Sequence, residues 1–165
     1  MLQETYDIGF KALPIVLFIA TFIGTNLALQ GYYTFAKFGG ESLVGIFVSL
    51  AGMREMAPIV AGAMVAAKSG ADIAARLATM RIKEQIDALS VMSVDPIWFL
   101  IVPKFIAIII VMPLLSLFAS FFCLISGFFV SVYQLGVSSG LFMENVYEYT
   151  TLYDIFVGSF KSVIF

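Results

Sequence analysis

Two adjacent charged residues, Arg54 and Glu55, stand in the middle of an apolar stretch and are the first candidates for chemistry. The apolar sequences SLVGIFVSLAG and MAPIVAGAMVAA lie on either side of them. Charged side chains inside a membrane are costly and usually face a bundle interior or a water-filled cavity. The pair therefore either borders a substrate pathway or moving interface, or forms a structural ion pair, with Lys161 as a candidate partner. A third interpretation places the pair near the membrane surface, between two shorter helices.

A polar stretch from Lys68 to Pro96 is the second candidate, and it holds 8 of the chain's 20 charged residues (9 basic and 11 acidic in total). Its apolar residues fall on two opposed helical faces: Ile73, Leu77 and Met80 on one, and Ile82, Ile86 and Leu89 on the other. A helix lying on a membrane keeps one apolar stripe. The pattern thus predicts a break near residues 80–82 or a helix contacted from both sides, with an ordinary solvated loop helix as the alternative.

Local pairs and caps in this stretch add detail to the prediction. The i,i+4 pairs Asp72/Arg76 and Lys83/Asp87 favour a helix. Residues 70–72 (Gly-Ala-Asp) offer a helix N-cap, and the Asp-Pro sequence at 95–96 predicts a helix stop.

The residue types that are missing exclude several kinds of chemistry. The chain has no His and one Cys, Cys123, so it can form neither an internal disulfide nor a His/Cys metal cluster, and Cys123 is predicted to be a packing residue. No G-x-x-x-x-G-K-[ST] phosphate loop is present. We therefore predict no catalytic residue, no metal and no cofactor. If ATP drives this protein, a partner subunit binds it. The net charge of −2 makes nucleic acid an unsuitable partner.

The composition of the chain indicates which kind of secondary structure carries these residues. The chain is 61% hydrophobic, with a mean hydropathy of +1.03, whereas soluble domains are about 45–50% apolar. Runs such as IAIIIVMPLLSLFASFF lack the alternation of a β-barrel. The sequence predicts an all-α, multi-pass membrane protein with about four spans. The expected spans are about 13–35, 42–67, 105–133 and 150–165, the last one incomplete.

Prolines and basic residues refine this topology. Pro14 suits the first turn of span one, whereas Pro58 and Pro113 could kink spans two and three. Five of the nine Lys and Arg residues lie between spans two and three, which places this loop in the cytoplasm. Small residues of span two favour close helix packing, within one subunit or at a homodimer seam: Ala57, Ala61, Gly62, Ala63, Ala66 and Ala67.

Several quoted segments resemble one known family. LPIV, ALQGYY and FGGE, then REMAPIVAGAMVAAKSGADIAARLATMRIKEQIDALSVMSVDP, and finally KSVIF are similar to the MlaE/YrbE permeases, the membrane subunits of MCE-type ABC transporters that maintain lipid asymmetry of the Gram-negative outer membrane. The resemblance implies one permease domain over residues 1–165 and a homodimer in the bacterial inner membrane. It also implies an ABC ATPase subunit (MlaF-like), a periplasmic MCE protein (MlaD-like) and phospholipid as substrate. Relative to the family's five membrane helices, we expect the last helix and an N-terminal interfacial segment to lie outside this sequence.

The resemblance also implies site residues. The lipid pathway comprises Leu27, Gln30, Tyr32, Thr34, Phe38, Arg54 and Glu55. ATPase coupling falls to Arg76, Met80, Arg81, Glu84, Asp87 and Leu89 within residues 68–96. Lys161 matches an intramembrane lysine. The function implied is phospholipid movement between the inner and outer membranes. The alternatives are a non-transporting scaffold that anchors an MCE protein, or an ion-coupled transporter with Glu55 as its proton site.

Overall fold

The computed structural model describes residues 2–93 and 95–165, and the regular elements within these residues are all helices. Three helical segments are long and apolar enough to cross a membrane: Thr5–Phe38, Glu41–Ile82 and Pro96–Gln134. The prediction of an all-α membrane protein is confirmed. The expected fourth span forms only the 13-residue helix α9 (Leu152–Ile164), shorter than the ~20 residues that a crossing requires. The described residues therefore contain about three spans rather than four.

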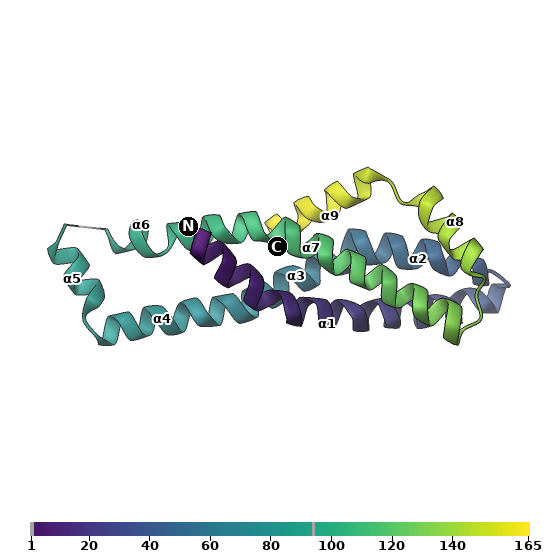
Figure 1. Cartoon of the computed structure of the whole chain (residues 1–165), viewed down its shortest axis with the longest axis horizontal. Helices are drawn as coiled ribbons and strands as arrows, with labels where there is room; N and C mark the ends of the chain where they lie inside the picture. The colour runs from purple at the N-terminus through teal and green to yellow at the C-terminus, as the bar shows by residue number, and fades with distance from the viewer. Residues whose placement is uncertain (1, 94) are drawn as a thin grey trace.

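The first span belongs to helix α1 (Leu2–Phe35), whose N-terminal part runs obliquely to the rest in Figure 1. Pro14 lies inside this helix, so the predicted helix start near residue 13 is wrong. Proline bends a helix without ending it when the preceding turn is itself helical. An ion pair between Lys11 Nζ and Asp7 Oδ1, 3.3 Å apart at i,i+4 spacing, supports that preceding turn.

The second span is continuous and longer than expected. It comprises α2 (Val44–Ala51), a π-helical turn (Gly52–Met56), α3 (Ala57–Val65), a second π-helical turn (Ala66–Gly70) and α4 (Ala71–Ile82). Gly70 has helical torsion angles, φ −60° and ψ −47°, so the predicted N-cap at residues 70–72 is wrong. Residues 66–70 form a π-helical turn, which is wider than an α-helical turn, and the helix continues through it into α4.

Helices α4, α5 (Gln85–Val91) and α6 (Pro96–Leu100) extend beyond the bundle at one end, as Figure 1 shows. The helix breaks at Lys83–Glu84, two residues past the predicted position, and Glu84 has a φ of +57°. This turn disrupts helical spacing, so the predicted Lys83/Asp87 pair is wrong and Asp87 pairs with Arg81 instead. Helix α5 runs across the end of α4 and not back along it (Figure 1), and we call α4, this turn and α5 the α4–α5 hairpin.

The end of this polar region also differs from the prediction. Asp95 begins α6 rather than ending a helix, because its Oδ1 accepts a hydrogen bond of 2.9 Å from the Ile97 N–H. Proline follows as the first residue of the helix, where it needs no N–H partner.

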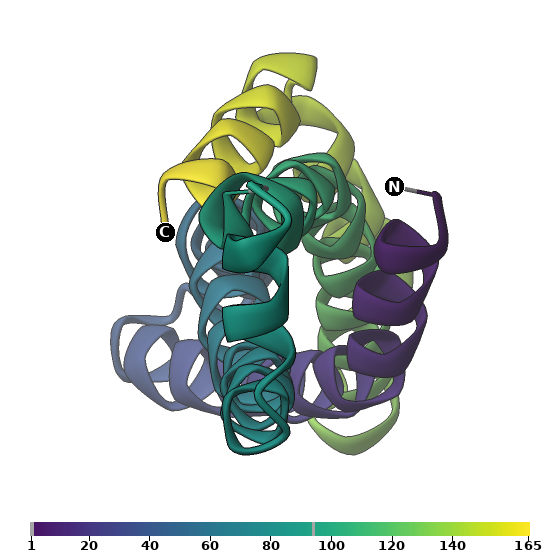
Figure 2. The same ribbon diagram turned by 90° about the vertical axis from the view of Figure 1, so that its left-hand side faces the viewer.

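The third span is α7 (Val102–Phe129), which continues through Pro113 and ends in a π-helical turn (Val130–Gln134). Helix α8 (Ser139–Tyr149) and α9 then fold back against α2 and α3. One core cluster lies between α1, α3 and α7 and includes Ile8, Ala12, Ala61, Ala107 and Val111. A second lies between α1, α2, α7 and α8 and includes Leu27, Val48, Cys123 and Phe142. The end-on view in Figure 2 shows how α1, α7 and the second span surround this interior.

The predicted packing roles are confirmed in part. Cys123 is buried in the second core, as expected. Ala57, Ala61 and Gly62 are buried within the chain, whereas Ala63, Ala66 and Ala67 are exposed. The homodimer seam stays a prediction.

Candidate functional site

Four charged side chains meet where α9 crosses the first π-helical turn. Arg54 Nε lies 2.9 Å from Asp154 Oδ1, and Lys161 Nζ lies 2.5 Å from Glu55 Oε1. Lys161 Nζ also lies 3.4 Å from the carbonyl oxygen of Arg54. We call these four residues the ion-pair quartet. Its formal charges sum to zero, so the two cations and two carboxylates neutralise one another locally.

The N-terminus of α9 fixes one half of the quartet. Asp154 Oδ2 accepts hydrogen bonds from the backbone N–H (2.9 Å) and the hydroxyl (2.8 Å) of Thr151. The Thr151 side chain in turn accepts from the Asp154 backbone N–H, which completes a capping box. Its other oxygen, Oδ1, is left for Arg54. Asp154 thus begins the helix and also ties it to the second span.

Gly158 brings the two elements close enough for these contacts. A Cβ at this position would lie 2.6 Å from the carbonyl oxygen of Met53, closer than real Cβ atoms come. Gly158 lies between Asp154 and Lys161, on the side of α9 that faces the π turn. Only a residue without a Cβ allows this approach.

Exposure separates the members of the quartet. The Asp154 side chain is 6% exposed and that of Arg54 is 41% exposed, whereas Lys161 and Glu55 are 35% and 53% exposed. One carboxylate is therefore anchored inside the bundle, and the other three groups line its edge. This arrangement holds helices in register and can rearrange, but it offers no nucleophile–base pair for catalysis.

The structure tests two of the three interpretations of Arg54 and Glu55, and the substrate pathway stays a prediction. Glu55 pairs with Lys161, but at the partly exposed edge of the bundle and not as the buried ion pair that was expected. The interpretation of two shorter helices is wrong, because the second span is continuous. Sequence reasoning missed Asp154. The pattern Thr151-x-x-Asp154 signals a capping box and could have marked the helix start, but nothing local signals its pairing with Arg54.

The predicted lipid-pathway residues divide between the core and the surface. Leu27 is buried in the second core, where its Cδ1 would lie 3.8 Å from a Cβ at Gly52 in the π turn. Tyr32 packs against the same core, and Gln30, Thr34 and Phe38 are exposed at the end of the first span. The structure thus brings Leu27 near the quartet but does not gather the set into one pocket. A nearby apolar hollow of ≈ 370 Å³ is lined by Phe35, Leu43, Ile46, Phe47, Leu50 and Ala51.

The predicted coupling residues all lie on the α4–α5 hairpin, and none of them is buried. Arg81 pairs with Asp87 across the turn and joins the two helices, and Arg76 Nε lies 3.1 Å from Asp72 Oδ2 as predicted. Glu84 has no ion-pair partner among the described residues. Met80 and Leu89 are half-buried.

Large apolar side chains are also exposed on and beside the hairpin. Ile82 is 82%, Val91 86% and Met92 71% exposed. Exposed apolar residues among charges are typical of a protein-binding surface. Within the described residues, no group of three or more His, Cys, Asp or Glu residues could hold a metal ion.

Comparisons with known proteins agree on one family. The family described as Permease MlaE matches residues 1–165. A probable ABC transporter permease protein of Rickettsia conorii is 40% identical over 165 residues, which cover 100% of this chain and 64% of that protein. The intermembrane phospholipid transport system permease protein MlaE of Haemophilus influenzae is 34% identical over 168 residues, covering 100% of this chain and 64% of that protein. A chloroplastic Arabidopsis thaliana protein, TRIGALACTOSYLDIACYLGLYCEROL 1, is 32% identical over 164 residues, 99% of this chain and 47% of that protein. The chain thus spans 64% of the length of the Rickettsia and Haemophilus relatives.

Proposed function

Because this chain belongs to the Permease MlaE family, we propose that it is the membrane subunit of an ABC transporter that moves phospholipid between the inner and outer membranes of a Gram-negative envelope. In this proposal the chain lies in the inner membrane and pairs with a second copy. It has no ATPase activity of its own. A separate ABC ATPase docks on its cytoplasmic side, and a periplasmic MCE protein sits at the opposite end.

The α4–α5 hairpin is the observation that carries this proposal. It projects from one end of the bundle (Figure 1), and none of the residues of α4 and α5 is buried. It also belongs to the segment that is rich in Lys and Arg, which the positive-inside rule places in the cytoplasm. An exposed helical segment that carries charged residues and two opposed sets of apolar residues fits a soluble subunit that contacts it from both sides.

The ion-pair quartet gives the hairpin a mechanical connection to the membrane region. The hairpin continues the same unbroken helical segment, Glu41–Ile82, that carries Arg54 and Glu55. A push on the hairpin by the ATPase would therefore reach the π turn, where α9 is held by two ion pairs. Rearrangement there would reshape the lipid path between the two copies, which includes the exposed residues at the end of the first span.

Charge reversal at Glu84 tests the docking assignment. Since Glu84 has no ion-pair partner among the described residues, Glu84→Lys changes the docking surface without breaking the hairpin's own Arg81–Asp87 pair. We expect the full-length permease with Glu84→Lys to lose stimulation of the partner ATPase and transport of phospholipid between vesicles. The matched control is Glu144→Lys, an exposed position on α8 at the far end of the bundle. Normal transport by Glu84→Lys in an intact complex would contradict the docking assignment.

The scaffold alternative makes a different prediction at Glu55. A scaffold that only anchors an MCE protein should tolerate Glu55→Gln once the complex has assembled. Loss of transport with intact assembly would favour a permease. Because Glu55 pairs with Lys161, the exchange Glu55→Lys with Lys161→Glu shows whether the pair or the carboxylate itself is needed.

A further inference from the structure

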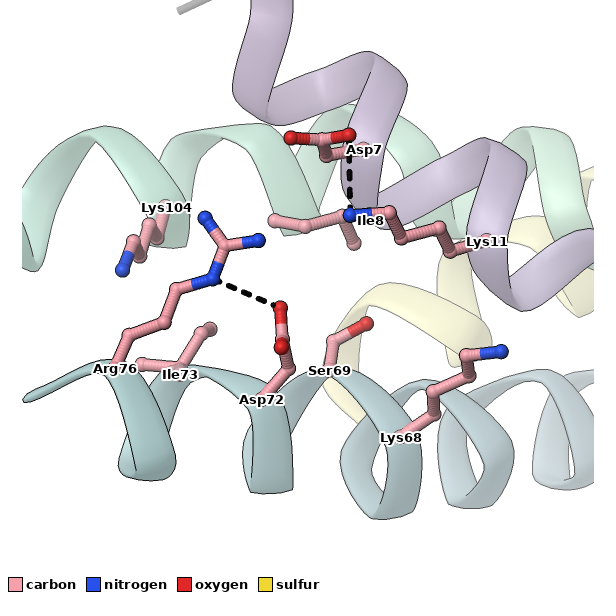
Figure 3. Close-up of a pocket in the computed structure, with 9 residues that line it drawn as sticks. All are labelled: Asp7, Ile8, Lys11, Lys68, Ser69, Asp72, Ile73, Arg76 and Lys104. Atoms are coloured by element: carbon pink, nitrogen blue, oxygen red, sulfur yellow. Dashed lines mark ion pairs between the residues drawn. The ribbon is translucent and has the colours of Figure 1, made fainter. Parts of the chain in front are cut away.

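A second charged cluster lies at the base of the hairpin, away from the quartet. Figure 3 shows a pocket between three helices, with side chains from α1, α4 and the start of α7. Its volume is ≈ 300 Å³, and its lining includes six charged side chains: Asp7, Lys11, Lys68, Asp72, Arg76 and Lys104.

The charges of this pocket do not balance. Asp7 pairs with Lys11, and Asp72 pairs with Arg76. Lys68 and Lys104 then have no hydrogen-bond or ion-pair partner among the described residues. The pocket therefore keeps two positive charges that the described part of the chain does not neutralise.

Lys104 is the cation that the fold holds most firmly in place. The residue is only 8% exposed, but its ammonium group is not among the described buried atoms that lack a partner, so it is open to the pocket. A buried stem with an accessible charged end presents a positive charge to an anion in this pocket.

The position of the pocket indicates what that anion is. Ile8 lines the pocket and also belongs to the first core cluster, so the apolar interior of the bundle begins directly beside the charges. The unpaired cations thus lie where the apolar bundle gives way to the polar hairpin, which is the depth of lipid headgroups. Basic pockets between membrane helices on the cytoplasmic side suit phosphate-bearing headgroups. Lys and Arg are also the side chains that bind phosphate oxygens.

We propose that the pocket between α1, α4 and α7 binds a phosphate group at the cytoplasmic membrane surface, from an anionic phospholipid headgroup or from free phosphate. Lys104 and Arg76, which lie on the same side of the pocket in Figure 3, are its main ligands, and Lys68 at the opposite end adds positive charge. The bound group ties the base of the hairpin to α1 and α7. This site is separate from the ion-pair quartet and from the proposed transport pathway.

Lipid binding to the full-length permease in its complex tests the proposal. The delipidated complex is placed in nanodiscs of phosphatidylcholine, with or without phosphatidylglycerol, and thermal unfolding and lipid retention by native mass spectrometry are measured. We expect phosphatidylglycerol to be retained and to stabilise the wild-type protein. Lys104→Gln should weaken this binding about tenfold or more, since it removes a charged partner of the phosphate, and Lys68→Gln should weaken it less, since Lys68 lies at the other end of the pocket. A control pair, Lys37→Gln with Lys83→Gln, removes two exposed charges outside the pocket and should bind normally.

Three outcomes distinguish a lipid headgroup from free phosphate as the bound group, and both from a result that overturns the proposal. If the wild type and the control pair retain phosphatidylglycerol and the pocket variants lose it, the site binds a lipid headgroup. Stabilisation of the wild type by inorganic phosphate in pure phosphatidylcholine, lost in the same variants, assigns it to free phosphate. Absence of both effects, or equal loss in the control pair, overturns the proposal. Lys68 is exposed, so Lys68→Gln leaves the fold intact, and Lys104→Arg should bind as the wild type does. None of these measurements depends on ATPase coupling, so they succeed or fail independently of the proposed function.

Discussion

Replacing Gly158 with alanine should separate α9 from the second span and lengthen both ion pairs of the quartet. The added Cβ would lie 2.6 Å from the Met53 carbonyl oxygen, which is 0.8 Å short of the 3.4 Å where ordinary contact begins. The obstacle is backbone, so no side chain can rotate away, and α9 must move by about that distance. The Arg54–Asp154 contact, now 2.9 Å, would lengthen beyond hydrogen-bond range.

The expected cost follows from two opposing terms. Overpacking a well-packed contact typically costs about 1–3 kcal/mol. Alanine is favoured over glycine in a helix by up to about 1 kcal/mol. The net loss should therefore be about 0–2 kcal/mol, before the weakened ion pairs are added. Thermal unfolding of the purified permease in detergent measures this loss, and ATPase stimulation in the complex shows whether the quartet matters for coupling.

Gly70→Ala provides the matched control. Gly70 has helical torsion angles, and a Cβ added at this position would have no atom within 4 Å. The same substitution should therefore leave stability unchanged or raise it slightly. If Gly158→Ala and Gly70→Ala unfold at the same temperature, α9 does not lie against Met53 as described, and the quartet geometry is wrong.

Two further predictions follow from buried groups. Arg54→Gln should lower the free energy of unfolding by about 1–3 kcal/mol, since it strands the buried Asp154 while Arg54 itself is partly solvated. Asp154→Ala removes the buried charge instead of stranding it, so its cost should come mainly from the lost hydrogen bonds to Thr151 at the start of α9, about 1 kcal/mol. An unchanged free energy of unfolding in Asp154→Ala, measured by thermal unfolding, would contradict its role at the start of α9. Cys123 is buried in the second core, so a maleimide should label it only after unfolding in SDS, whereas a cysteine introduced by Ser90→Cys on the exposed face of α5 should react at once. Fast labelling of native Cys123 would mean that the second core opens.

Sequence patterns predicted those features of the fold that depend on local composition. Hydropathy gave the apolar spans, and the opposed apolar faces placed the hairpin break within two residues of Glu84. Lys161 was a candidate partner for the Arg54 and Glu55 pair, since an intramembrane cation needs a partner, and the structure places it against Glu55. These features depend on the free-energy cost of exposing a given residue type to lipid or water. That cost follows from the residue type and can therefore be read from one sequence.

The features that were missed depend on contacts between distant segments. Nothing near Asp154 in the sequence indicates Arg54, a hundred residues earlier. The N-terminal turns of α1 were assigned outside the first span, so Asp7 and Lys11 were not expected beside Lys68 and Lys104. The helix also continues through Gly70, because glycine permits a break without requiring one.

Arg54 and Glu55 are adjacent in the sequence, but their partners Asp154 and Lys161 are separated along α9. Asp154 and Lys161 are seven residues apart, about 10.5 Å along α9, so they lie on one face two turns apart. Arg54 and Glu55 must therefore reach in opposite directions along α9, with Gly158 contacting Met53 between them. A shift of α9 by one turn in either direction would break both pairs together, since neither cation could follow. The quartet thus sets the register of α9 against the second span, and in the proposed transport cycle a movement of α9 by one turn would have to exchange both pairs at once.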